Sequence, residues 1–105
     1  LYSSAATPAL LAQTADQTTT AWAANTTMTQ ALATVQTIAT TGIYWAAINV
    51  TATTPPTLLG TIAAPAIATG ERNLSQSSGS SLTTTAPATI ATPTAKQFVP
   101  YVVLT

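Results

Sequence analysis

Apolar residues gather in two short runs of this chain, and small or polar residues fill the stretches between them. The first run covers residues 43–50 (Ile-Tyr-Trp-Ala-Ala-Ile-Asn-Val), and the second covers residues 98–104 (Phe-Val-Pro-Tyr-Val-Val-Leu). Successive side chains of a β-strand point to opposite faces, and in the first run both faces would be largely apolar. This pattern predicts two β-strands, at least one of them central to a sheet, with the first strand covered on both sides.

Shorter extended pieces are expected at residues 1–2, 10–14 and 57–62, with a stiff Thr-Thr-Pro-Pro turn at residues 53–56 before the last of them. Pro100 lacks a backbone N–H, so we expect it near the start of its strand or at a sheet edge. Several short strands punctuated by Gly and Pro predict an all-β fold, an antiparallel β-sandwich.

The segment at residues 28–39 fits two interpretations. Met28, Leu32 and Val35 recur at helical spacing, and the alanines between them favour a helix. The many β-branched threonines in and around the segment lose side-chain freedom in a helix, and no charged helix face is present. We therefore favour a strand and leave the helix as the alternative.

The length of 105 residues predicts one domain spanning residues 1–105. Because the chain starts at Leu1 rather than Met, we expect the domain to continue upstream. Residues 75–94 are rich in Ser, Thr, Ala and Pro, which predicts a loop or an extended segment.

The composition indicates that the chain is part of an assembly and not a compact monomer. The chain holds 25 Thr and 22 Ala, only 4% of its residues are charged, and the net charge is zero. Leu, Ile, Val and Phe together number only 21, which predicts a thin core. A thin core and a neutral surface both favour association with other chains.

Candidate chemistry is almost absent. The chain has no His and no Cys, and its only carboxylates are Asp16 and Glu71, which lie far apart in the sequence. General acid–base catalysis needs a positioned titratable group, and a metal site needs several ligands together. We therefore expect no catalytic, cofactor-binding or metal-binding residues and no enzyme activity. With two cations and no apolar stretch of about 18 residues, neither nucleic-acid binding nor membrane insertion is expected.

The aromatic residues are the remaining candidates for contact with a partner. Trp22, Trp45 and Tyr101 offer broad apolar faces that pack at interfaces or stack on sugars. The plainer interpretation is that they supply the core of a domain built from small residues. Trp22 is the one most expected to be exposed, because its neighbours are Ala and polar residues.

The order of the segments resembles a known group of proteins. Leu1-Tyr2-Ser3 followed by residues 10–16 (Leu-Leu-Ala-Gln-Thr-Ala-Asp), then residues 42–48, 53–60 and the aromatic, Pro-containing end at residues 98–102, resemble carboxy-terminal domains of actinobacterial bacteriophage virion proteins. These are minor tail, fibre or capsid decoration proteins. The resemblance covers most of the chain but consists of short motifs. It implies a jelly-roll-like sandwich, a place in the virion and no catalysis.

Two functions follow as expectations. The first is a non-enzymatic virion structural protein that binds identical copies or other virion proteins. The alternative is an attachment module that binds a host cell-surface glycan through its aromatic side chains. A hydrolase is disfavoured because the acid–base residues are missing.

Overall fold

The computed structural model describes residues 1–3, 7–62, 74–79, 82–83 and 85–104. Four short strands occur in this part of the chain: β1 (Gly60–Ile62), β2 (Ser75–Ser77), β3 (Thr94–Lys96) and β4 (Phe98–Pro100). The described residues contain no helix. The prediction of an all-β chain is therefore confirmed for these residues. At residues 28–39, both the strand that we favoured and its helical alternative are wrong. Those residues are irregular apart from a bridge between Leu32 and Thr14.

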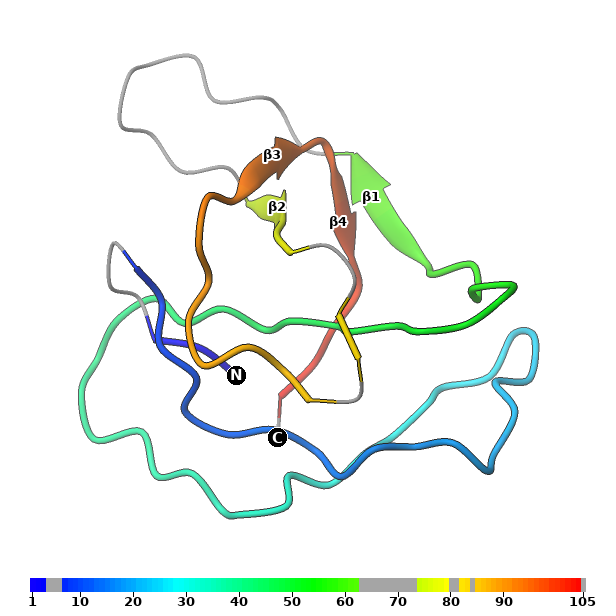
Figure 1. The fold of residues 1–105 in the computed structure, drawn as a ribbon, viewed down its shortest axis with the longest axis horizontal. Coiled ribbons are helices and arrows are strands. Elements are labelled where there is room, and N and C mark those ends of the chain that lie inside the picture. The colour runs from blue at the N-terminus through cyan, green and yellow to red at the C-terminus, as the bar shows by residue number, and fades with distance from the viewer. Residues whose placement is uncertain (4–6, 63–73, 80–81, 84, 105) are drawn as a thin grey trace.

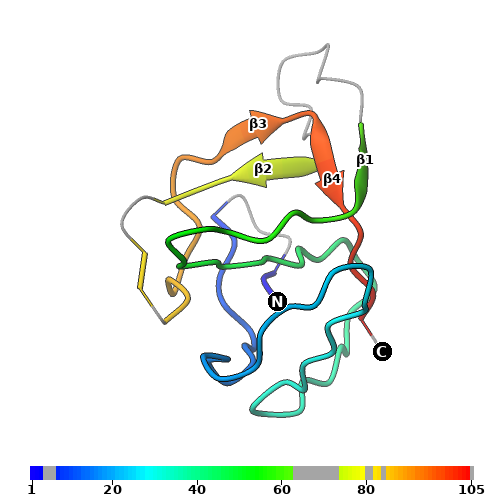
Figure 2. The ribbon, with the colours of Figure 1, turned by 90° about the vertical axis from the view of Figure 1, so that its right-hand side faces the viewer.

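The strands form two separate antiparallel pairs. β1 pairs with β4 and β2 pairs with β3. Only Gln97 separates β3 from β4, so the chain turns a corner there and passes directly from one pair to the other (Figures 1 and 2). β2 also lies beside β4, which brings the two pairs together at one end of the molecule.

A second centre of order lies around Tyr2, which pairs with two segments at once. On one side, the Tyr2 N–H donates to the Trp45 carbonyl over 2.8 Å, and the Trp45 N–H returns a bond to the Tyr2 carbonyl over 3.0 Å. On the other side, the Ser3 N–H donates to the Ala9 carbonyl. Residues 9 and 10 in turn pair with the chain near Thr89. Four segments thus lie edge to edge in the order Trp45, Tyr2, residues 9–10 and Thr89, all antiparallel.

The Tyr2 side chain makes the core of this centre. It is 2% exposed, and its phenol O–H donates to the Pro87 carbonyl over 2.7 Å. Among the described residues, only Pro8 and Ala12 are buried alongside it. The prediction of a thin core is confirmed for this part of the chain, because one aromatic side chain supplies most of its volume.

The strand predicted at residues 43–50 is wrong as a regular strand. Only Trp45 pairs, through the bridge to Tyr2, and Ile43 and Ile48 are exposed. The physical reason is that the segment around Tyr2, which pairs with Trp45, is short. The chain passes Tyr2 and within a few residues pairs as residues 9–10 on the opposite side, so no long ladder forms beside residues 43–50.

The strand predicted at residues 98–104 is shorter than expected. β4 ends at Pro100, and one further bond, from the Tyr101 N–H to the Leu59 carbonyl at 2.8 Å, extends the pairing with β1. The described chain beyond Tyr101 has no strand partner. Both described sheets have two strands, so the expectation that a predicted strand would be central is also wrong.

Gly60 and Pro100 face each other in the β1–β4 pair. A Cβ on Gly60 would overlap the Val99 carbonyl and lie 2.5 Å from Cζ of Phe98, so the Phe98 ring rests directly on the glycine. Phe98 pairs with Ile62 and reaches Gly60 on the diagonal. Because the Tyr101 N–H points toward β1, the preceding Pro100 nitrogen points away from it. Pro100 therefore costs no ladder bond, and its predicted place at a sheet edge is confirmed.

Candidate interaction surface

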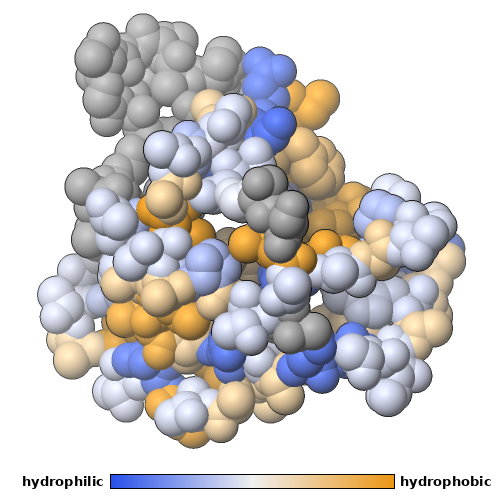
Figure 3. Space-filling view, in the orientation of Figure 1, coloured by the Kyte–Doolittle hydropathy of each residue, from blue (hydrophilic) through white to orange (hydrophobic). Residues whose placement is uncertain are grey.

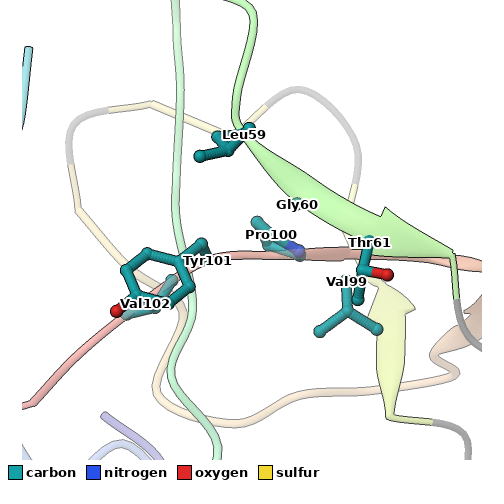
Figure 4. Close-up of a pocket in the computed structure, with 7 residues that line it drawn as sticks. All are labelled: Leu59, Gly60, Thr61, Val99, Pro100, Tyr101 and Val102. Atoms are coloured by element: carbon teal, nitrogen blue, oxygen red, sulfur yellow. The ribbon is translucent and has the colours of Figure 1, made fainter. Parts of the chain in front are cut away.

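An open groove of about 500 Å³ follows the β1–β4 pair. Its lining is Leu59, Gly60, Thr61, Val99, Pro100, Tyr101 and Val102. Figure 4 shows the side chains of Leu59, Tyr101 and Val102 at one end of the groove and those of Thr61 and Val99 at the other. Thr61 and the Tyr101 phenol supply the polar side-chain atoms, so the groove is suited to an apolar or uncharged partner and not to an ion.

Exposed apolar side chains continue beyond the groove. Leu59 and Ile62 on the β1 side are 82% and 81% exposed, and Val103 and Leu104 beyond β4 are also exposed. Figure 3 shows hydrophobic side chains among near-neutral ones on this face, with strongly hydrophilic residues at its top and across its lower part. A protein surface that holds exposed apolar side chains together in this way commonly marks a contact site.

The three aromatic residues singled out from the sequence lie in different places. Tyr101 is 74% exposed and lines the groove. Trp22 is 42% exposed beside a turn in which Asn25 has a φ of 57° and the Thr26 hydroxyl donates to the Ala23 carbonyl. Trp45 is half-buried against Tyr2. Trp22 is thus more exposed than Trp45, as its sequence neighbours predict, and only Tyr101 belongs to the groove.

Trp45 carries a buried polar atom. Its indole Nε1 is buried without a hydrogen-bond partner among the described residues. An indole N–H that is buried without an acceptor is energetically costly. Trp45 lies beside the small core around Tyr2 and does not line the groove.

Titratable side chains contribute little to this surface. Asp16 and Lys96 are both exposed, and Glu71 and Arg72 lie outside the described residues. No cluster of three or more His, Cys, Asp or Glu side chains suited to a metal occurs in the part of the chain that the structure describes. Within that same part, no helix has the length and apolar character needed to cross a membrane.

Sequence reasoning did not single out Leu59, Ile62 or Val102 as surface residues. A signal was present, because residues 57–62 combine Leu and Ile with a complete lack of charge. That signal indicates an apolar strand, but whether such a strand is covered depends on its partners, which the sequence does not specify.

Comparison of the chain with protein-family models, with curated proteins and with solved structures finds no match.

Proposed function

We propose that this chain is a non-enzymatic structural domain of a bacteriophage particle, of the minor tail, fibre or capsid decoration type. It acts by binding copies of itself or other virion proteins. In this proposal the two small strand pairs belong to a jelly-roll-like sandwich that other strands complete. The resemblance of residues 1–3, 10–16, 42–48, 53–60 and 98–102 to virion proteins supports the place in the particle. The exposed β1–β4 groove supports the mode of action.

The single observation that carries the proposal is the imbalance between buried and exposed apolar side chains. Among the described residues, Tyr2 and Ala12 form the buried hydrophobic core, whereas Leu59, Ile62 and Tyr101 are largely exposed. Burying a large apolar side chain contributes about 1.5–3 kcal/mol. Covering these three side chains with a neighbouring chain would therefore add several kcal/mol that the isolated chain forgoes.

Glycan binding is the second candidate, and the exposure of Trp22 favours it. An exposed indole beside an uncharged, Thr-rich turn resembles a platform on which a sugar ring stacks. The two functions are compatible, because Trp22 does not line the groove.

Particle composition tests the first function. Particles from the source would be purified by density gradient, washed in high salt and analysed by mass spectrometry, with immunogold labelling to place the chain. We expect stoichiometric recovery of this chain with the particles. The proposal is wrong if the chain is recovered only in the soluble fraction of the lysate.

A matched pair of variants connects the groove with assembly. Val102→Asp places a charge in the groove, and Val35→Asp places the same charge on another exposed valine outside it. We expect Val102→Asp to lower incorporation into particles at least tenfold and Val35→Asp to leave incorporation unchanged. Trp22→Ala should leave incorporation unchanged and, if the glycan function is correct, abolish sedimentation of the chain with host envelopes.

A further inference from the structure

The two edges of the β1–β4 pair differ in their capacity to accept another strand. On β4, the backbone groups of Phe98 and Pro100 point away from β1, but Pro100 has no N–H to donate. In addition, β2 lies beside this strand. On β1, the Leu59 carbonyl points toward β4, so the N–H and C=O groups of Gly60 and Ile62 point outward. None of the described residues bonds to these groups.

Among the residues that the structure describes, the outer edge of β1 also lacks the features that keep natural edge strands from pairing. Such edges are commonly protected by a lysine, a proline, a bulge or a covering segment. Residues 57–62 contain no charged residue and no proline, and β1 pairs with β4 in unbroken register. The exposure of Leu59 and Ile62, above 80% for both, shows that these side chains are uncovered.

Backbone groups on an open edge bind an extended strand, and the charge pattern selects which strand. No charged side chain occurs between residues 17 and 70, so the edge has no counter-charge for an acidic or basic peptide. A second copy of β1 matches it, because two uncharged edges meet without repulsion and each supplies the same outward N–H and C=O groups.

We propose that the outer edge of β1, with the exposed Leu59 and Ile62 side chains, is a strand-pairing interface that binds β1 of a second copy in antiparallel orientation. This inference rests on the proposed function, since it specifies how copies of the chain associate. A two-fold axis then runs through the middle of the paired strands, and the β4 edges lie on the outside of the dimer.

Charge placed on the edge tests this interface in solution. Ile62→Lys adds a lysine to the β1 edge, and Ile43→Lys is the matched control on an isoleucine that is 73% exposed and lies outside the strands. In analytical ultracentrifugation of the full chain, we expect the wild type and Ile43→Lys to dimerise alike and Ile62→Lys to raise the dissociation constant at least tenfold. Circular dichroism of each variant is the control that checks for the wild-type fold.

Cysteine cross-linking tests the same interface without added charge. The chain has no Cys, so each introduced thiol is unique. Cα atoms directly opposite in an antiparallel pair are about 4.5–5.5 Å apart, within the range that a disulfide spans. We expect at least one of Leu59→Cys, Thr61→Cys and Ile62→Cys to form a covalent dimer at least tenfold faster than Ile43→Cys.

Three outcomes overturn the inference: a monomeric wild type, an Ile62→Lys variant that dimerises like the wild type, or cross-linking no faster on β1 than at residue 43. None of these changes whether the chain is recovered with particles. Failure of the strand-pairing interface and failure of the virion function are therefore distinguishable.

Discussion

Tyr2 shows how much of this molecule depends on one side chain. Its backbone pairs with Trp45 on one side and with the chain around Leu10 on the other, and its phenol reaches Pro87. It therefore connects residues that are as far apart in the sequence as 2 and 87. In a chain whose described core is small, such a residue contributes a large share of the stability, because few other side chains can compensate for its loss.

Removing the phenol oxygen isolates one part of that contribution. Tyr2→Phe keeps the ring and leaves the Pro87 carbonyl without this donor, so we expect a loss of about 1–2 kcal/mol in the free energy of unfolding. Tyr2→Ala also removes the ring, and we expect a loss of about 3–5 kcal/mol, enough to unfold a marginal domain. Urea denaturation followed by circular dichroism measures both. Equal stability of Tyr2→Phe and wild type would show that the bond to Pro87 contributes nothing.

The same phenol makes stability depend on alkaline pH. Burial raises the pKa of Tyr2 above its ordinary value near 10, because the charged phenolate is disfavoured away from water. The folded state then holds its proton more tightly than the unfolded state. The resulting stabilisation is fully present below pH 10 and is lost as the pH rises through the folded-state pKa. We expect Tyr2→Phe to reduce the loss of stability above pH 10, and urea midpoints across pH 8–12 would measure it; identical pH profiles for the two proteins would contradict it.

At the scale of elements, the sequence predicted the type of secondary structure better than the lengths of the strands. The all-strand character followed from β-branched residues and turn signals, and the edge position of Pro100 followed from its missing N–H. The regular strand at residues 43–50 did not form, because a strand requires a partner of matching length and only Tyr2 lies beside Trp45. The groove was missed for a related reason. Its lining comes from residues 59–61 and 99–102, which are brought together by pairing across the chain.

The packing of β4 against β1 depends on the missing side chain of Gly60. The Phe98 ring covers the glycine, and a Cβ there has no room. We expect Gly60→Ala to destabilise the β1–β4 pair by about 1–3 kcal/mol through overpacking. Gly42→Ala is the control, because Gly42 is exposed, does not have a positive φ and belongs to no strand. Thermal unfolding distinguishes them: the Gly60 variant should melt several degrees lower, whereas equal melting temperatures would show that the Phe98 ring and the Val99 backbone both shift freely to admit the Cβ.

At the scale of the whole molecule, the feature that bears most on the proposed association is the lack of charge. With 4% charged residues and zero net charge, long-range repulsion between copies would be weak, and the exposed apolar side chains would supply the attraction in the proposed assembly. The sequence-based expectation that Trp45 or Tyr101 lies in or beside a contact between chains remains a prediction.

Salt provides a test at this scale. Association driven by apolar burial and backbone pairing should change less than about threefold in dissociation constant between 0.05 and 1 M sodium chloride, since there are few charges to screen. Sodium sulfate should tighten it, because excluded salts favour burial of apolar surface. Sedimentation equilibrium in both salts measures the effect. A steep weakening in sodium chloride would instead indicate contacts made by Asp16, Lys96 or the Glu71-Arg72 pair.

The nitrogen of Pro100, turned outward on β4, has a consequence for the size of any assembly built by strand addition. A sheet with two receptive edges can recruit chains without limit and become a fibre. Here one edge accepts a strand and the other presents a ring where a donor would be needed. When β1 of one copy pairs with β1 of another, both receptive edges are occupied, so the proposed assembly would stop at a dimer. In the proposed dimer, Pro100 together with the neighbouring β2 would keep strand addition along this sheet from continuing into a fibre.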